Sequence, residues 1–198
     1  MSDDVLARIL DSTDFAVGGG SAAALAGAMA AGLAGMVARL SPGKECGLTD
    51  ARYAAIADEA DDLRRQLQAG AAKDADAYAV VKAAYSLPRD GEQAQTARRA
   101  AIEQALVAAS VVPCDNARRA ARVEDLCAEL AGRSNPAAAS DLDVGARLAA
   151  AAVAGCVSNV DVNTSMLPGS EEAARLSKEA ANLLGRGHAT STIVGSTA

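Results

Sequence analysis

The stretch VGGGSAAALAGAMAAGLAGMVAR, residues 17–39, joins three consecutive glycines to an alanine-rich run that carries no charge before its last residue. Glycine adopts backbone angles closed to other residues, and serine is a preferred N-cap. We therefore predict a turn at residues 18–20, an N-cap at Ser21 and a buried helix that ends near Leu40. The free N–H groups at the start of such a helix suit an anionic or polar ligand.

The same stretch admits two other interpretations. A Gly-Gly-Gly-Ser sequence is typical of a flexible linker. Residues 17–38 are also long enough and sufficiently uncharged to span a membrane, although Ala and Gly contribute little transfer free energy, so a core helix is favoured. A phosphate-binding P-loop is excluded, because no β-branched strand precedes the glycines and no Gly-Lys-Ser/Thr sequence follows them.

The composition of the whole chain favours helices. Of its 198 residues, 51% are hydrophobic and only 2% are aromatic. Alanine is the best helix former and is depleted in strands, so we predict an all-α fold with no sheet. The expected architecture is a single-domain bundle of long antiparallel helices over residues 1–184, followed by a flexible tail at 185–198. Alanine-lined helices dock closely, which also favours a homodimer.

Charge and cysteine content limit the partners and the compartment. A formal net charge of −6 argues against a nucleic-acid partner, which would require a basic surface. The four cysteines form no Cys-x-x-Cys pair and the N-terminus does not resemble a signal peptide, so a reduced, cytoplasmic protein without a membrane partner is expected. The single histidine, His188, lies in the predicted tail, so neither a metal site nor a Ser-His-Asp triad is expected.

Two stripes run along the predicted helix after the glycines. Spacings of three and four place one set of large apolar residues on a common face, where we expect deep burial. A second stripe of small residues is expected to allow close packing against a neighbouring helix. The large residues are Leu25, Met29, Leu33, Met36 and Leu40, and the small ones are Gly27, Ala31 and Gly35.

Helix signals recur along the rest of the chain. Thr49 is the predicted N-cap of a helix over residues 50–87, which Pro88 ends. The next helix follows Gly91, and Pro113 is expected to kink or break it. Beyond it, Ser140 and Asp143 have the spacing of a capping box and open a helix whose body, residues 148–160, is again free of charge.

Two amides, Asn159 and Asn163, share one face of this last helix. Because a buried amide without a partner costs about 1–3 kcal/mol, each needs an acceptor or donor. Contact with a neighbouring backbone and contact with a ligand both satisfy that need. Pro168 and Gly169 then lead into a final amphipathic helix at residues 170–184.

Four stretches carry a resemblance to a known family. They are GGGSAAALAGAMAAGLAGMVARL at 18–40, DADAYAVVKAAYSLP at 74–88, RRAAIEQALVAASVVP at 98–113 and SDLDVGARLAAAAVAGCVSNVDVN at 140–163. Together they resemble the cyclodeaminase domain of formiminotransferase-cyclodeaminase and its stand-alone relatives, the methenyltetrahydrofolate cyclohydrolases. Two positions differ from the family pattern: Val17 stands where a proline is usual, and Arg89 where a lysine is usual.

The resemblance implies an all-helical dimer that binds a reduced folate and acts on the one-carbon unit between its two nitrogens. Such chemistry needs an acid or base but no metal. The candidate acid/base residues are Asp141 and Asp74. The candidate substrate-binding residues are Gly18, Gly19, Gly20, Ser21, Lys44, Asn159 and Asn163. We expect the glycine turn to lie close to Asp141 and to the two amides, with Arg98 or Arg99 available to a glutamate tail.

The expected activity is that of a methenyltetrahydrofolate cyclohydrolase, because no fused transferase domain is present in the chain. The alternative within the same family is a formimidoyltetrahydrofolate cyclodeaminase, which releases ammonia. A tetrahydrofolate derivative is expected as substrate, with no permanently bound cofactor. A non-catalytic helical scaffold or binding protein is the alternative from another class.

Overall fold

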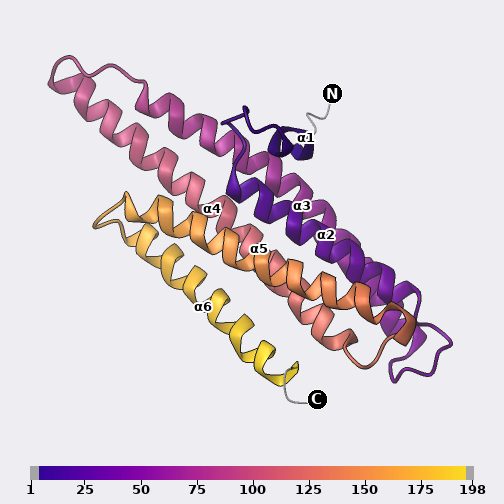
Figure 1. Cartoon of the computed structure of the whole chain (residues 1–198). Helices are drawn as coiled ribbons and strands as arrows, with labels where there is room; N and C mark the ends of the chain where they lie inside the picture. Colours follow the sequence, from indigo (N-terminus) through magenta and orange to yellow (C-terminus); the bar gives the residue numbers. More distant parts are fainter. Residues whose placement is uncertain (1–4, 195–198) are drawn as a thin grey trace.

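The computed structural model describes residues 5–194, with side chains described as far as Arg186. The described chain is helical and contains no strand, so the all-α prediction is confirmed (Figure 1). Its elements in order are α1 (Val5–Leu10), α2 (Gly19–Arg39), α3 (Asp50–Tyr85), α4 (Glu92–Leu130), a 3₁₀ turn η1 (Pro136–Ala138), α5 (Ala139–Ser165) and α6 (Glu171–Val194).

The bundle is built on α2, which packs against α3, α4 and α5. The longest helices, α3 and α4, form a hairpin whose tip projects beyond the start of α2 (Figure 1). Helix α5 runs antiparallel to α2. A Cβ atom added at Gly145 would lie 3.3 Å from Leu33, whereas one added at Gly155 would lie 2.8 Å from Ala23.

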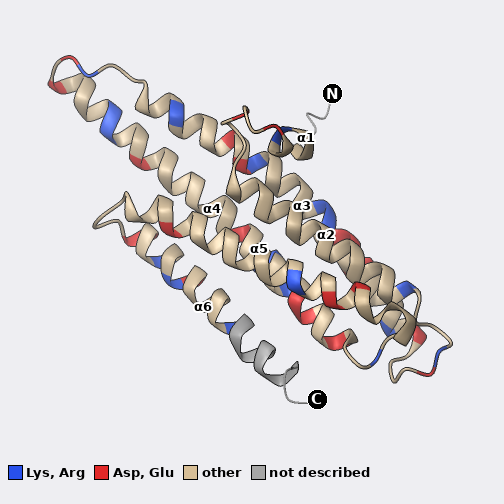
Figure 2. Cartoon of the chain, in the orientation of Figure 1, with Lys and Arg blue, Asp and Glu red and all other residues tan. Residues whose placement is uncertain are grey.

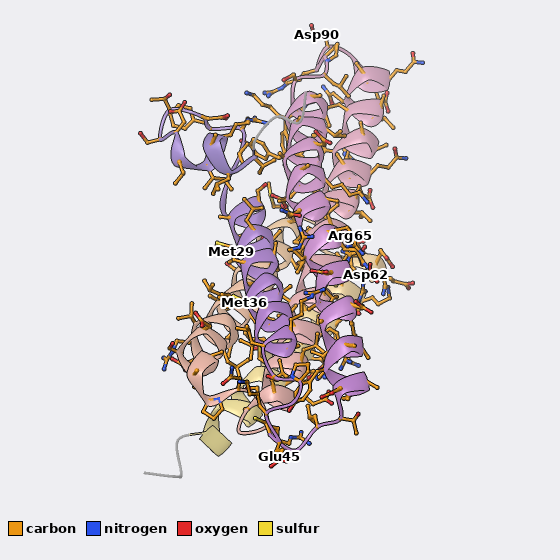
Figure 3. The ribbon with its side chains drawn as sticks, turned by 90° about the vertical axis from the view of Figure 1, so that its right-hand side faces the viewer. Met29, Met36, Glu45, Asp62, Arg65 and Asp90 are labelled. Carbon is orange, nitrogen blue, oxygen red and sulfur yellow. The ribbon has the colours of Figure 1, made fainter. Side chains whose placement is uncertain are left out.

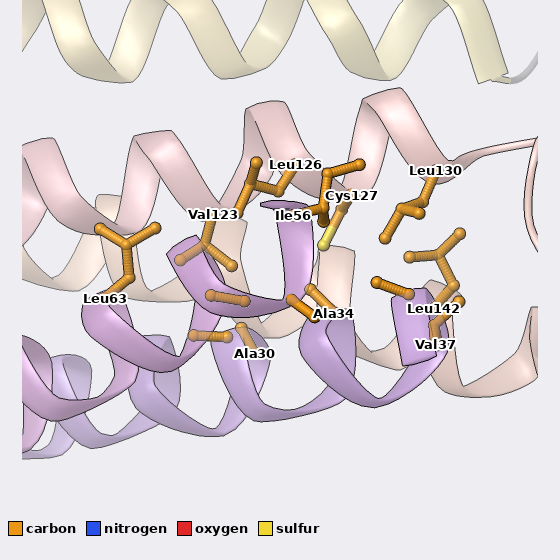
Figure 4. Close-up of a cluster of buried hydrophobic side chains, with 14 of the residues drawn as sticks. Ala30, Ala34, Val37, Ile56, Leu63, Val123, Leu126, Cys127, Leu130 and Leu142 are labelled. Atoms are coloured by element: carbon orange, nitrogen blue, oxygen red, sulfur yellow. The ribbon is translucent and has the colours of Figure 1, made fainter. Parts of the chain in front are cut away.

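Small residues form the buried face of α2. Ala30 and Ala34 lie in a core cluster with Leu63 of α3 and Val123 and Leu126 of α4 (Figure 4). At Gly27 an added Cβ would lie 3.2 Å from Leu67 and 3.3 Å from Ala152, so a larger residue there would crowd both neighbours. Dense packing of this kind gains many short dispersion contacts without bulky side chains.

The large apolar stripe of α2 is not buried as predicted. Met29 is 52% exposed, Met36 38% and Leu40 47%, and both methionines point away from the bundle (Figure 3). The alanine face packs so closely against α3 and α5 that the longer side chains are left on the outside. Nearby, α5 exposes Val144 and Val162.

By length and composition α2 could cross a membrane, with a mean hydropathy of 1.7 over 18 residues. However, 61% of that apolar stretch is buried within the bundle. In this fold α2 is therefore a core helix with one exposed apolar face.

Pro113 was predicted to kink or break its helix, and α4 continues through it without a break. Proline has no N–H to donate, so the carbonyl four residues earlier, at Ala109, loses its helical partner. Asn163 of α5 supplies the missing donor: its Nδ2 atom lies 2.9 Å from the Ala109 oxygen. A side chain from another helix thus lets α4 keep its proline.

The predicted start of α3 is confirmed, whereas the predicted start of α5 and the predicted end of α6 differ from the structure. Thr49 caps α3 as expected, because its side chain accepts a hydrogen bond from the N–H of Arg52 at 3.2 Å. The capping box at Ser140 is wrong, since α5 begins at Ala139 directly after η1 and Ser140 lies inside the helix. The backbone of α6 is helical to Val194, beyond the predicted end at Leu184, and the last residues of the predicted tail, 195–198, lie outside the described chain.

Candidate functional site

The start of α2 is organised by a partner from α3. The N-cap is Gly18, not Ser21 as predicted, and no side chain of Gly18 can cap the helix. Ser21 is instead buried inside the first turn. Its Oγ lies 2.9 Å from the carbonyl oxygen of Ala71 and 3.0 Å from Oδ2 of Asp74, both on α3.

Asp74 replaces the missing cap. In addition to the Ser21 hydroxyl, its carboxylate accepts the backbone N–H of Ser21. A negative charge at a helix N-terminus is favoured by the free N–H groups and the helix dipole. The carboxylate approaches so closely that a Cβ added at Gly20 would lie 2.5 Å from Oδ1, which explains why glycine occupies this position.

Burial raises the pKa of Asp74 above its ordinary value of 3.8, although both hydrogen bonds from Ser21 act in the opposite direction. Desolvation disfavours the charged form, and here it outweighs the hydrogen bonds. A carboxyl with a raised pKa keeps its proton to a higher pH than an ordinary aspartate does.

The Ser21 hydroxyl adapts to either protonation state of Asp74. It has one hydrogen and two acceptors, Asp74 and the Ala71 carbonyl, within reach. When Asp74 is ionised, the hydroxyl can donate to it. When Asp74 is protonated, the carboxyl can donate to the hydroxyl, which in turn donates to Ala71.

Asn159 lies beside this cluster, as predicted. A Cβ added at Gly19 would lie 3.8 Å from its Nδ2 atom. The same amide donates to the carbonyl of Gly155, one turn earlier in α5, at 3.1 Å.

The thiol of Cys156 is also close to this cluster. Burial raises its pKa to about 12, the negative charge of Asp74 acts in the same direction, and the thiol is therefore neutral.

For Asn163 the sequence left two roles open, contact with a neighbouring backbone and contact with a ligand. The structure shows the first. The Asn163 amide nitrogen is occupied by Ala109, where it compensates for Pro113. The predicted pair of amides therefore divides: Asn159 borders the glycine turn, whereas Asn163 supports α4.

Asp141 and Lys44 do not join the cluster within one chain, contrary to the prediction. Asp141 is in the first turn of α5, roughly 27 Å along that helix from Asn159 at about 1.5 Å per residue. Lys44 follows the C-terminal end of α2. Its neighbour Glu45 and the hairpin residue Asp90 lie at opposite ends of the molecule (Figure 3).

The described chain thus brings Gly18, Gly19, Gly20, Ser21, Asp74 and Asn159 together where α2, α3 and α5 meet. Gly18 and Gly19 are exposed, whereas Gly20 and Ser21 are buried. No local pattern in the sequence predicts that Asp74 caps α2, because the contact joins residues far apart in the chain.

The bundle of long helices is shared with a solved structure. The fold matches formiminotetrahydrofolate cyclodeaminase from Thermotoga maritima with a TM-score of 0.76, covering 96% of this chain and 89% of that one, at 24% sequence identity. The likeness establishes the fold.

Sequence comparison then identifies the family. Residues 3–182 match the family described as formiminotransferase-cyclodeaminase, and the chain belongs to that family. It is also 34% identical over 168 residues to a methenyltetrahydrofolate cyclohydrolase of Methylorubrum extorquens, covering 84% of this chain and 81% of that protein.

Proposed function

We propose that the protein is a methenyltetrahydrofolate cyclohydrolase, which converts 5,10-methenyltetrahydrofolate and water to 10-formyltetrahydrofolate. Family membership and the similarity to the Methylorubrum protein support a folate enzyme. The single observation that carries the proposal is Asp74, a half-buried carboxyl with a raised pKa beside an exposed glycine turn.

Hydrolysis requires two proton movements. Water attacks the electrophilic methenyl carbon as Asp74 accepts a proton, which leaves a hydroxyl on that carbon. The bond from the carbon to N5 then breaks, N5 receives a proton from Asp74, and the carbonyl of the 10-formyl product forms with loss of the hydroxyl proton to water. The Ser21 hydroxyl can support Asp74 in both states, as its two acceptors allow.

The exposed backbone of the glycine turn contributes to binding. Gly18 and Gly19 present main chain without side chains at the N-terminus of α2. Free N–H groups at this position attract polar and partly negative atoms, such as the carbonyl of a pterin ring. Asn159 offers its amide oxygen from the adjacent turn of α5.

We further infer that the protein is a homodimer joined through α2 and α5. The exposed face of α2 carries Met29 and Met36 (Figure 3). Leu40 of α2 and Val144 and Val162 of α5 are exposed as well. Figure 2 shows α2 almost without charge. Apolar surface of this extent is typical of a protein–protein interface.

Dimerisation would bring Asp141 and Lys44, which lie far from the Asp74 cluster of their own chain, close to the cluster of the other subunit. A twofold axis perpendicular to α2 puts the N-terminus of one α2 beside the C-terminus of the other. Asp141 of the partner subunit and Lys44 of the partner subunit then approach the cluster around Asp74. In this arrangement each site is completed across the interface.

An absorbance assay with methenyltetrahydrofolate and formiminotetrahydrofolate tests the activity. We expect the enzyme to consume the methenyl substrate and to yield 10-formyltetrahydrofolate. Release of ammonia from the formimino substrate, without hydrolysis of the methenyl substrate, would instead support a cyclodeaminase. Turnover of neither, with folate binding retained, would support a binding protein.

A further inference from the structure

A pocket lies at the tip of the α3–α4 hairpin, away from the Asp74 cluster. It has a volume of about 340 Å³. Five side chains line it: Arg89, Gln95, Arg98, Arg99 and Ile102. Three of the five are arginines, and no carboxylate contributes to the lining.

Within the described chain these arginines have no acidic partner. Most other arginines of the described chain form ion pairs with a carboxylate, which is expected in a protein of net charge −6. The hairpin also carries Asp90, Glu92 and Glu103, but none of the three forms an ion pair with an arginine of the pocket within the described chain. Three guanidinium groups around one cavity, none of them paired with a carboxylate of the described chain, point to an anionic ligand.

Contacts with Tyr85 fix the side chain of Arg98. It donates to the backbone carbonyl of Tyr85 at 3.1 Å, and its guanidinium lies 5.6 Å from the centre of the Tyr85 ring. Its Nε atom is buried and has no hydrogen-bond partner. A buried donor without an acceptor costs free energy, which an incoming carboxylate oxygen would recover.

The pocket and the Asp74 cluster lie along one face of α3. At about 100° per residue, Asp74, Tyr78, Val81 and Tyr85 fall on a common stripe of the helix. The distance from Asp74 to Tyr85 along the axis is roughly 16 Å at about 1.5 Å per residue. Tyr78 lies between Asp74 and Tyr85 on this stripe and is 49% exposed, so an aromatic side chain borders the surface that connects the Asp74 cluster to the pocket.

We propose that the arginine pocket binds the glutamate carboxylates of the folate substrate. This inference rests on the proposed function, because it assigns the far end of the same ligand. With the pterin at Asp74, the aminobenzoyl ring passes Tyr78 and the glutamate tail enters the pocket. Arginine pairs with carboxylates through two parallel hydrogen bonds, so a tail with several γ-linked glutamates engages more than one guanidinium.

The test compares the wild type with an Arg89→Ala/Arg99→Ala double variant, which keeps Arg98 and its contact with Tyr85. Three substrates are used: methenyltetrahydropteroate without glutamate, the monoglutamate and the γ-linked triglutamate. In the wild type we expect KM to fall in that order. In the variant we expect KM to rise roughly tenfold or more for the triglutamate, with kcat unchanged and no change for the pteroate.

Arg65→Ala is the matched control, because it removes a positive charge from α3 at an exposed site paired with Asp62. It should leave every KM unchanged. An equal rise for all three substrates in the double variant, or no rise for any, would overturn the proposal. Competition by inorganic phosphate as strong as that by tri-γ-glutamate would reassign the pocket to a free phosphate.

A binding measurement separates this proposal from the catalytic one. If the wild type hydrolyses none of the substrates, the proposed activity has failed, and calorimetry with tri-γ-glutamate alone still tests the pocket. Binding by the wild type and by Arg65→Ala, with at least a tenfold loss in the double variant, supports the pocket. Equal affinity in all three proteins, or no binding in any, rejects it.

Discussion

Asp74 has two roles that make opposite demands on its charge. As the cap of α2 it is favoured in the ionised form by the N–H and hydroxyl of Ser21. As a half-buried group it is favoured in the neutral form, and the net effect is a raised pKa. A carboxyl held between these tendencies is suited to exchanging a proton with a substrate.

Gly20 is the residue whose substitution should disturb this arrangement most directly. Gly20→Ala would place a methyl group 2.5 Å from Asp74 Oδ1, so the carboxylate must move and its bonds to Ser21 weaken. We expect a loss of about 1–3 kcal/mol in the free energy of unfolding, together with a large fall in kcat. Urea denaturation and the hydrolysis assay measure the two effects.

Gly185→Ala on α6 provides the control, because nothing lies within 4 Å of its added Cβ. Alanine in an exposed helical position should raise stability by about 0.5–1 kcal/mol and leave turnover unchanged. If Gly20→Ala behaves like Gly185→Ala, the close approach of Asp74 to α2 is wrong.

The raised pKa of Asp74 also predicts how stability depends on pH. The folded protein holds this proton more tightly than the unfolded chain, so the favourable contribution is complete below the ordinary pKa of 3.8 and is lost as pH rises through the folded pKa. Asparagine does not titrate, so the stability of Asp74→Asn does not fall with pH for this reason. The unfolding free energy of the variant minus that of the wild type should therefore increase with pH, as measured by urea denaturation at several pH values.

The opposite trend, a difference that shrinks as pH rises, would mean that the hydrogen bonds from Ser21 outweigh burial. The pKa of Asp74 would then be lowered, and its role as a proton carrier would lose its physical basis.

Among the helices, α4 shows most clearly how tertiary contacts override a local signal. Pro113 alone predicts a kink or a break, but α4 is continuous there, and Asn163 from α5 satisfies the carbonyl that proline leaves free. The start of α2 is likewise completed by a side chain from another helix, because Asp74 of α3 caps it. Thr49 and Pro88, by contrast, mark the ends of α3 correctly, because both signals act within a few residues.

The link between Asn163 and Pro113 can be measured with a double-mutant cycle. Asn163→Ala leaves the Ala109 carbonyl without a donor and should cost about 1–3 kcal/mol of unfolding free energy. In a Pro113→Ala background, residue 113 again has an N–H for that carbonyl. The same Asn163→Ala change should then cost less, and the coupling energy should lie within about 0.5–3 kcal/mol.

Equal costs in the two backgrounds would show that Asn163 does not compensate for the proline. A large loss of activity without loss of stability in Asn163→Ala would return this residue to the substrate site.

For the whole molecule, composition sufficed to predict an all-helical bundle, but not which face of α2 is inside. Alanine and glycine allow the closest approach of backbones, so the small stripe forms the core and the methionines remain outside. The site was predicted in part: Asp74, Asn159 and the glycine turn converge. Asp141 does not, because antiparallel packing puts the N-termini of α2 and α5 at opposite ends.

The exposed methionines predict the assembly state. Met29→Glu puts a charge in the centre of the proposed α2 interface and should convert a dimer to a monomer, as measured by sedimentation velocity. Activity should fall with dimerisation, because each site needs residues from both subunits. Val80→Glu, at a 57% exposed position of α3, is the control and should leave the dimer intact.

A wild type that sediments as a monomer would remove the proposed interface. A monomeric Met29→Glu protein with full activity would show that each subunit holds a complete site.

The pH dependence of methenyltetrahydrofolate hydrolysis by the wild type and by Asp74→Asn tests most directly whether Asp74 moves the proton. We predict that kcat of the wild type falls on the acid side through a pKa above 3.8, as Asp74 becomes protonated before it can act as a base. The variant should lose roughly 10²–10⁴-fold in kcat and lack this acid limb, while keeping its fold. Wild-type turnover with an unchanged acid limb in Asp74→Asn would contradict the assignment.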